Sequence, residues 1–154
     1  MARLTVDELL TRARERLDRV TVDRVLDVVA GGAVLVDIRS ELQRDRDGLI
    51  PGAAFHPRNV LEWRLDPSSG HDDPALSGDL DRRVVLVCNE GYQSSLAAAT
   101  LQDLGFSCAT DLVGGFQAWL EAGLPVYSPQ RNPVGAGRGS SGLGGSAPSG
   151  SSSL

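Results

Sequence analysis

The sequence contains no lysine, only two cysteines, and no hydrophobic run long enough to cross a membrane. Its fifteen basic residues are all arginine and are outnumbered by twenty acids, so the net charge is −5, which disfavours nucleic acid as a partner. A membrane span needs roughly 18 consecutive apolar residues, and no stretch of the chain approaches that length. The first residues also lack the basic and then apolar pattern of a secretory signal. We therefore expect a cytoplasmic protein that binds neither membranes nor nucleic acid.

The two cysteines, Cys88 and Cys108, are too few for a disulfide framework. The two histidines form no Cys/His cluster with the spacing of metal ligands, so we expect no metal site. A Cys88–Cys108 disulfide is also disfavoured. Cys88 ends one predicted strand, whereas Cys108 precedes the next, at the opposite edge of the sheet and beyond the limit of about 7 Å for a disulfide.

Composition divides the chain into three parts. Residues 1–19 are predicted to be a helical extension that packs on the domain, because residues 5–8 have the form of a capping box and apolar residues follow at helical spacing up to residue 18. Residues 20–127 have the composition of a folded domain. Residues 128–154 are mostly Gly, Ser and Pro, and this segment is predicted to be a flexible tail because it contains too little apolar surface to offset the entropy of ordering.

Between residues 20 and 127, short apolar runs alternate with helical periodicity. Strands are predicted at 33–37, 84–88 and 109–113. Helices are predicted at 22–30, 94–104 and 116–122. The first two strands are almost entirely apolar, which is typical of strands that are buried on both faces of a parallel sheet. The alternation predicts an α/β fold around a mostly parallel sheet.

One predicted strand ends in a reactive side chain, that of Cys88. Because ligands of open parallel sheets bind beyond the carboxyl ends of the strands, Cys88 is the candidate nucleophile. The loop 89–93 leads directly into a helix, so backbone N–H groups and the helix N-terminus are expected to favour an anion there, including a thiolate. The alternative is a buried cysteine that acts as a small hydrophobic residue, and the spacing alone does not decide between the two.

Four segments, in order and spacing, resemble the rhodanese (thiosulfate sulfurtransferase) family. Residues 88–94 resemble its active-site loop, which opens with cysteine and has glycine three residues on and serine or threonine six residues on. Residues 35–39 resemble its valine-aspartate-x-arginine strand end, and residues 50–53 resemble its isoleucine-proline-glycine-alanine segment. Residues 112–126 resemble its C-terminal signature. The resemblance covers about residues 20–127.

The resemblance implies a rhodanese-like three-layer α/β/α domain with a five-stranded parallel sheet. It also implies a sulfurtransferase. Cys88 would take sulfane sulfur from thiosulfate, 3-mercaptopyruvate or a persulfide, hold it as a persulfide and pass it to a thiol acceptor, without a cofactor. The implied substrate-binding residues are Asn89, Glu90, Gly91, Tyr92, Gln93 and Ser94 in the loop, together with Asp37, Arg39 and Arg58.

The loop departs from the family pattern in its charge. Many members have an arginine where Gln93 stands, and this loop contains Glu90 and no cation. We therefore expect weak thiosulfate–cyanide activity, because an anionic donor loses a bidentate partner. Arg39, Arg58 and Arg64 could compensate if they face the pocket, and each could instead be a solvated surface residue.

Two other functions are considered beside the enzyme. A non-catalytic rhodanese-like module for protein binding or redox sensing is favoured by the missing loop arginine, whereas the retained Cys88 favours the enzyme. A persulfide passed between proteins would fit both features. A phosphatase of the same fold is disfavoured, because its loop is one residue longer and ends in arginine, whereas Ser94 stands six residues after Cys88.

Deleting residues 128–154 is expected to leave the melting temperature of the domain nearly unchanged, because this segment has too few apolar residues to pack on a core. Scanning calorimetry of the full chain and the shortened chain measures the difference. A loss of several degrees would show that the segment packs on the domain.

Overall fold

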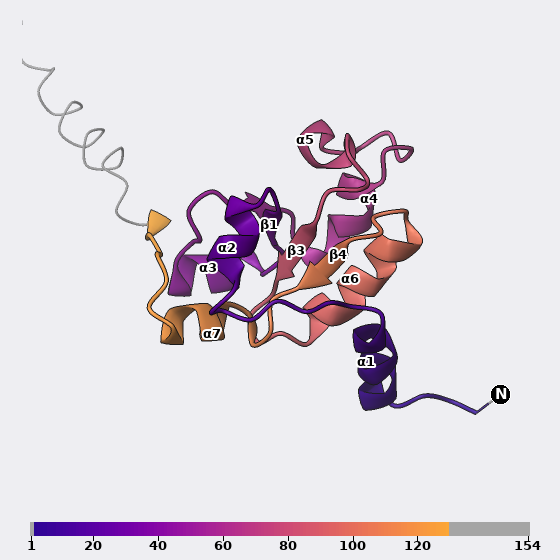
Figure 1. Cartoon of the computed structure of the whole chain (residues 1–154), viewed down its shortest axis with the longest axis horizontal. Helices are drawn as coiled ribbons and strands as arrows, with labels where there is room; N and C mark the ends of the chain where they lie inside the picture. The colour runs from indigo at the N-terminus through magenta and orange to yellow at the C-terminus, as the bar shows by residue number, and fades with distance from the viewer. Residues whose placement is uncertain (1, 130–154) are drawn as a thin grey trace, which may run out of the picture.

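A computed structural model of the chain describes residues 2–129, so residues 130–154 of the predicted tail lie outside the described part (Figure 1). In chain order its elements are α1 (Val6–Glu15), α2 (Val25–Ala30), β1 (Val34–Asp37), α3 (Glu41–Asp47), β2 (Ala54–Phe55), the 3-10 helix η1 (Arg58–Val60), α4 (Leu61–Leu65), α5 (Pro74–Ser77), β3 (Val84–Val87), α6 (Gln93–Asp103), β4 (Ala109–Asp111) and α7 (Gly115–Glu121). No helix within residues 2–129 combines the length and the apolar character that a bilayer span requires.

The sheet has four strands in the order β2-β1-β3-β4, and every neighbouring pair is parallel. This confirms the α/β fold with a parallel sheet. The resemblance implies five strands, and residues 2–129 contain four in the sheet; beside β4 the chain adds one isolated parallel bridge, between Val20 and Leu112. The segment stops at one bridge because the chain turns at residues 22–24. The carboxyl ends of β1 and β3 lie side by side, since Asp37 pairs in register with Val87.

The strands bury alternate side chains in two separate hydrophobic clusters, one on each face of the sheet. Val36, Val84 and Leu86 belong to the cluster that includes residues of α4, α5 and α6. Val85 and Val87 belong to the cluster that includes residues of α2 and α7. Helices therefore cover both faces, as expected for a three-layer domain. All four side chains of β3 are buried, which explains its continuous apolar sequence.

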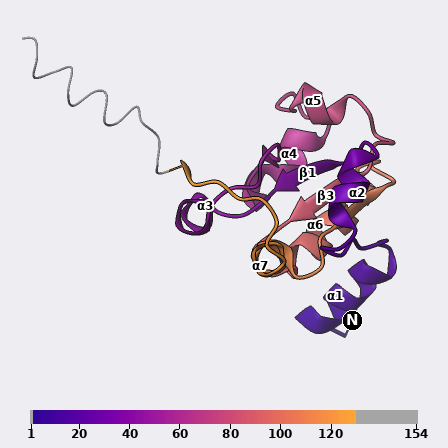
Figure 2. The same cartoon turned by 60° about the vertical axis from the view of Figure 1, so that its left-hand side comes forward.

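The N-terminal helix α1 packs against α6 and lies at the opposite end of the molecule from α5 (Figures 1 and 2). Its predicted cap is present, because the Thr5 side chain accepts a hydrogen bond from the Glu8 backbone N–H at 3.1 Å. Ala13 is buried in the contact with α6. At the rim, Arg16 forms an exposed ion pair with Asp103 of α6, with an N–O distance of 2.7 Å. Residues 1–19 thus contribute a helix to the surface beside α6.

Helix α3 was not predicted from the sequence. It has no buried residue, so no hydrophobic periodicity marks it. A reciprocal capping box starts it, in which Ser40 accepts from the Gln43 N–H at 3.1 Å and the Gln43 side chain accepts from the Ser40 N–H at 3.2 Å. Local capping therefore fixes where α3 begins.

A buried ion pair closes the end of β1. Arg39 is 0% exposed and donates two side-chain hydrogen bonds to the Asp37 carboxylate, at 3.0 and 2.8 Å. It also donates to the Gly48 carbonyl at 2.8 Å, and its guanidinium lies 3.6 Å from the centre of the Phe116 ring. Arg39 thereby joins β1, the end of α3 and α7.

Replacing Arg39 with alanine is expected to lower the free energy of unfolding by about 3–5 kcal/mol, because it leaves the buried Asp37 carboxylate without its main partner. Arg83→Ala is the matched control. It breaks an exposed pair with Asp18 at 3.3 Å and should lose at most about 1 kcal/mol. Urea denaturation followed by circular dichroism measures both variants. Equal losses would contradict the structural role assigned to Arg39.

Candidate active site

Cys88 lies directly after β3, at the carboxyl edge of the sheet, and it is 2% exposed. The loop that follows folds back over the sulfur. The Gly91 backbone N–H donates to the Cys88 Sγ atom at 3.1 Å, and Cys88 Sγ lies 3.2 Å from the Ser94 Oγ atom. Helix α6 begins at Gln93, so its N-terminus adds the positive end of a helix dipole at the same place. The sulfur therefore has one backbone donor, the Gly91 N–H, and one hydroxyl partner, that of Ser94, next to the N-terminus of α6.

Helix α7 holds two carbonyl groups of the loop from outside. The Cys88 carbonyl accepts from the Phe116 N–H at 2.8 Å, and the Asn89 carbonyl accepts from the Gln117 N–H at 3.0 Å. The Gln117 side chain also donates to the Asn89 side-chain oxygen at 3.0 Å. Because these acceptors are already engaged with α7, they are turned away from the space in which a substrate would react.

Gln117 has a second partner in Asp47, the last residue of α3. The Gln117 side-chain amide lies 3.3 Å from an Asp47 carboxylate oxygen. The pKa of the Asp47 carboxyl lies below its ordinary value, chiefly because the Arg46 side chain donates hydrogen bonds to it. Asp47 is therefore an anionic acceptor at neutral pH, and it links α3 to the support of the loop.

Two glycines allow the loop and α7 to approach so closely. Gly91 has φ +87° and Gly115 has φ +61°, a backbone region that residues with side chains rarely adopt. A Cβ atom on Gly91 would lie 2.7 Å from the Gly114 nitrogen. A Cβ atom on Gly115 would lie 2.5 Å from the Cys88 carbonyl oxygen. The close contact between the Cys88 loop and the start of α7 therefore requires glycine on both sides, at Gly91 and at Gly115.

A second set of supports comes from the N-terminal segment, which the sequence analysis did not connect with the site. Arg14 of α1 and Arg19 donate to the Gly91 carbonyl oxygen, at 2.8 and 3.1 Å. Arg14 also donates to the Ser95 side chain at 3.0 Å. No local pattern indicates these contacts, because they join residues that are more than 70 positions apart.

Asp111 of β4 lies beneath the loop and is fully buried. Its carboxylate accepts from the Ser94 and Ser95 hydroxyls, both at 2.7 Å, and from Arg19 at 2.8 and 3.2 Å. The signal in the sequence is an acid within the predicted strand 109–113, because a carboxylate that a central strand buries requires hydrogen-bond partners. Asp111 joins Ser94, which touches the cysteine, to the N-terminal segment.

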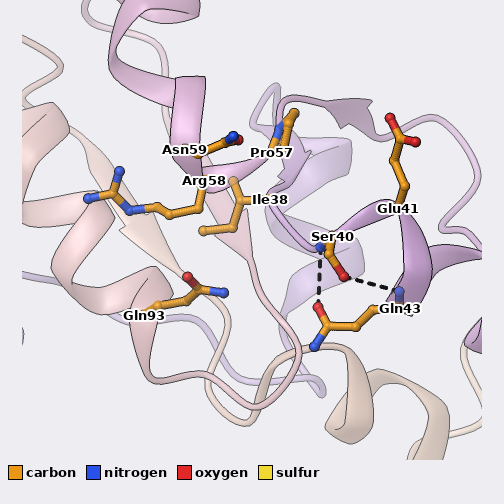
Figure 3. A pocket seen from close by; sticks show the side chains of 8 residues that line it. All are labelled: Ile38, Ser40, Glu41, Gln43, Pro57, Arg58, Asn59 and Gln93. Atoms are coloured by element: carbon orange, nitrogen blue, oxygen red, sulfur yellow. Dashed lines mark hydrogen bonds between the residues drawn. The ribbon is translucent and has the colours of Figure 1, made fainter.

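Cys88 lines a pocket of about 320 Å³. A second pocket, of about 600 Å³, lies next to it and shares two of its lining residues. The smaller pocket is lined by Gln43, Cys88, Asn89, Glu90, Tyr92 and Gln93. The larger one is lined by Ile38, Ser40, Glu41, Gln43, Pro57, Arg58, Asn59 and Gln93. Figure 3 shows the side chains of Gln43 and Gln93, which belong to both pockets, pointing into the space between them. The amide side chains of Gln43, Asn89 and Gln93 therefore line the space around the sulfur together with the Glu90 carboxylate.

The predicted arginines lie in different places. Arg58 lines the larger pocket, where it donates to Glu62 at 2.7 Å. Arg39 lies buried against Asp37 and lines neither pocket, and Arg64 donates instead to the His71 carbonyl. Of the residues in the described range 2–129, Arg58 is the one cation that lines these two pockets, and its charge is paired. In the same range, no group of three or more His, Cys, Asp or Glu side chains could hold a metal ion.

The chain is similar to proteins that are named as sulfurtransferases. A sulfurtransferase from Allochromatium vinosum is 33% identical over 97 residues, which are 63% of this chain and 80% of the relative. The thiosulfate sulfurtransferase GlpE from Pseudomonas entomophila is 37% identical over 101 residues, covering 66% of this chain and 83% of the relative.

Solved structures agree with this pattern. A Rhodopseudomonas palustris protein, described as of unknown function and a possible tyrosine phosphatase, has a TM-score of 0.76 and 32% identity over 82% of this chain and 97% of its own. The human single-domain sulfurtransferase TSTD1 has a TM-score of 0.56 and 28% identity over 67% and 95%. The model of the rhodanese-like domain matches residues 21–122. This chain therefore belongs to the rhodanese-like domain family.

Proposed function

We propose that this protein is a sulfurtransferase in which Cys88 carries sulfane sulfur as a persulfide. The observation that carries the proposal is the surroundings of the sulfur: Cys88 Sγ receives the Gly91 N–H at 3.1 Å, while the neighbouring loop carbonyls bind groups outside the loop. Such a loop presents donors to an anionic sulfur. The sulfurtransferases among the relatives support the same chemistry.

The first half-reaction loads the cysteine. The Cys88 thiolate attacks the outer sulfur of a donor R–S–S⁻, a new S–S bond forms on Cys88, and the donor's own S–S bond breaks to release R–S⁻. The terminal sulfur of the persulfide then carries the negative charge. We assign its stabilisation to the backbone N–H groups of residues 89–94 and to the N-terminus of α6.

The second half-reaction returns the cysteine to its starting state. An acceptor thiolate attacks the terminal sulfur, takes it as a new persulfide and releases the Cys88 thiolate. The Ser94 hydroxyl binds the Cys88 sulfur both when the sulfur is a thiol and when it is a thiolate, because the single hydrogen of the hydroxyl can point to either of two partners. When Cys88 is a thiol, Ser94 accepts from the sulfur and donates to Asp111, and when Cys88 is a thiolate, the Ser94 hydroxyl turns its hydrogen to the sulfur. No cofactor takes part in this sequence of steps.

The charge of the pockets favours a thiol-borne persulfide, on a small molecule or a protein, over thiosulfate as the donor. The mouth of the smaller pocket carries Glu90, and Gln93 stands where a cation would bind a dianion. In the larger pocket, Arg58 is already paired with Glu62. The neutral amides of Gln43 and Gln93 suit a persulfide and a thiolate, which carry a single negative charge at sulfur, better than the dianion thiosulfate.

The Rhodopseudomonas palustris relative is described as a possible tyrosine phosphatase, but the loop of this chain does not suit that activity. Phosphate needs a bidentate cation at the end of the loop, whereas residues 89–94 contain no arginine and the sixth position holds Ser94 against the sulfur. A non-catalytic binding or redox-sensing module remains the second candidate, favoured by the absence of a loop cation. Sulfur loading of Cys88 decides between the two.

Incubation with a small persulfide should add one sulfur atom to the wild-type protein and none to Cys88→Ala, because the new S–S bond forms on Cys88. Intact-mass spectrometry measures the gain, and a thiol acceptor should then remove it. Cys108→Ala is the matched control, since it deletes the other, exposed cysteine and should load like the wild type. Thiosulfate and 3-mercaptopyruvate are tested in parallel. If none of the three donors loads the folded wild-type protein, the binding module is favoured instead.

Gln93→Arg is expected to raise kcat/KM for thiosulfate by roughly three- to ten-fold, because it adds a bidentate cation at the mouth of the smaller pocket. Turnover of a persulfide R–S–S⁻ with an uncharged R group should change less, because this donor carries one negative charge and thiosulfate carries two. Gln93→Glu is the charge-reversed control and should lower the thiosulfate value. Steady-state assays with both donors measure the ratio, and an unchanged ratio in Gln93→Arg would show that charge at this position does not select the donor.

A further inference from the structure

Two arginines that precede the family-matched region contact the catalytic loop. The match to the rhodanese-like domain begins at residue 21, whereas Arg14 lies on α1 and Arg19 in the segment after it. Both donate to the same acceptor, the Gly91 carbonyl oxygen. The Gly91 N–H is the group that donates to Cys88 Sγ. The N-terminal segment is therefore linked to the reacting sulfur through a single residue, Gly91.

The two arginines differ in their charge balance. Arg19 forms a two-point ion pair with the buried Asp111 carboxylate, so its charge is compensated. Arg14 directs its donors to the Gly91 carbonyl and the Ser95 hydroxyl, which are neutral acceptors, and its guanidinium lies 5.8 Å from the centre of the Tyr92 ring. Among the ion pairs formed by residues 2–129, none includes Arg14. Its guanidinium therefore has no direct carboxylate partner among these residues; it reaches Asp111 only through the Ser95 hydroxyl, and it is half-buried beside the loop.

We infer that Arg14 is a positioning residue of the active site, which holds the Gly91 carbonyl away from the sulfur and lends the loop the positive charge that Gln93 does not supply. This inference rests on the proposed role of Cys88 as the site of an anionic persulfide. A trans peptide directs its C=O and N–H in opposite directions, so fixing the Gly91 carbonyl on the arginines also directs the following N–H, that of Tyr92, away from them. The positive charge of Arg14 attracts an anion at the loop although the Arg14 side chain does not line the pocket.

The residue that follows α1 offers a matched control. Arg16 stands two residues after Arg14 and also reaches α6, where it pairs with Asp103. That pair is exposed, and Arg16 makes no side-chain contact with the loop in the described structure. Replacing Arg16 therefore removes one arginine and one contact between the N-terminal segment and α6, as replacing Arg14 does. It leaves both arginine hydrogen bonds to the Gly91 carbonyl in place, whereas replacing Arg14 leaves that of Arg19 alone.

The test compares two alkylating reagents of nearly equal size, anionic iodoacetate and neutral iodoacetamide, on the full chain carrying Cys108→Ala. The ratio of their rates at Cys88, followed by mass spectrometry at low salt, reports the local charge and cancels changes in cysteine reactivity that affect both reagents. In Arg14→Gln, we expect the ratio of iodoacetate to iodoacetamide rates to fall at least about three-fold. In Arg16→Gln, it should remain at the value of the parent protein. Arg14→Lys, which keeps the charge, should retain most of the ratio.

An unchanged ratio in folded Arg14→Gln would overturn the inference, and so would an equal fall in Arg14→Gln and Arg16→Gln. Circular dichroism checks the fold of each variant, and Arg14→Met, which keeps much of the side-chain volume, supplies a second uncharged variant. The readout needs no sulfurtransferase turnover. A failure of sulfur loading and a failure of the Arg14 inference are therefore separate results.

Discussion

The geometry of the candidate active site depends on where the carbonyl groups of one short loop find their hydrogen bonds. A loop that surrounds a sulfur contains as many backbone acceptors as donors, and an acceptor turned inward would repel an anion. Here the carbonyls of Cys88 and Asn89 bind α7, and that of Gly91 binds two arginines from the N-terminal segment. Two glycines of positive φ, Gly91 and Gly115, permit this close contact. The arrangement leaves the Gly91 N–H directed at the sulfur.

A buried carboxylate links the parts of the molecule that hold this loop. Asp111 accepts hydrogen bonds from two serines at the start of α6 and from Arg19. Through Ser94 it is connected to the Cys88 sulfur, and through Arg19 to the segment before the family-matched region. Because a buried charge without partners is costly, the Asp111 carboxylate requires these hydrogen bonds to stay buried. The position of the cysteine thus depends on residues from both ends of the described chain.

The parts of the fold that sequence predicted are those with a local signal. Continuous apolar runs marked β1 and β3, and the loop motif marked Cys88 with Gly91 and Ser94 around it. The surface helix α3 has no buried residue, so only its capping box could have indicated it. Arg14 could not be assigned because its partner lies 77 positions away in the chain. Asp37 and Arg39 were expected to bind substrate, whereas the chain buries them as an ion pair that lines neither pocket.

The most direct test of this arrangement is a crystal structure of the protein with Cys88 loaded as a persulfide. We expect the terminal sulfur to lie within hydrogen-bonding distance of backbone N–H groups of residues 89–94, with the Gly91 carbonyl still bound to Arg14 and Arg19 and the Cys88 carbonyl still bound to α7. A loop in which these carbonyls have turned toward the terminal sulfur, or a terminal sulfur that contacts no loop N–H group, would contradict the proposed basis of the site.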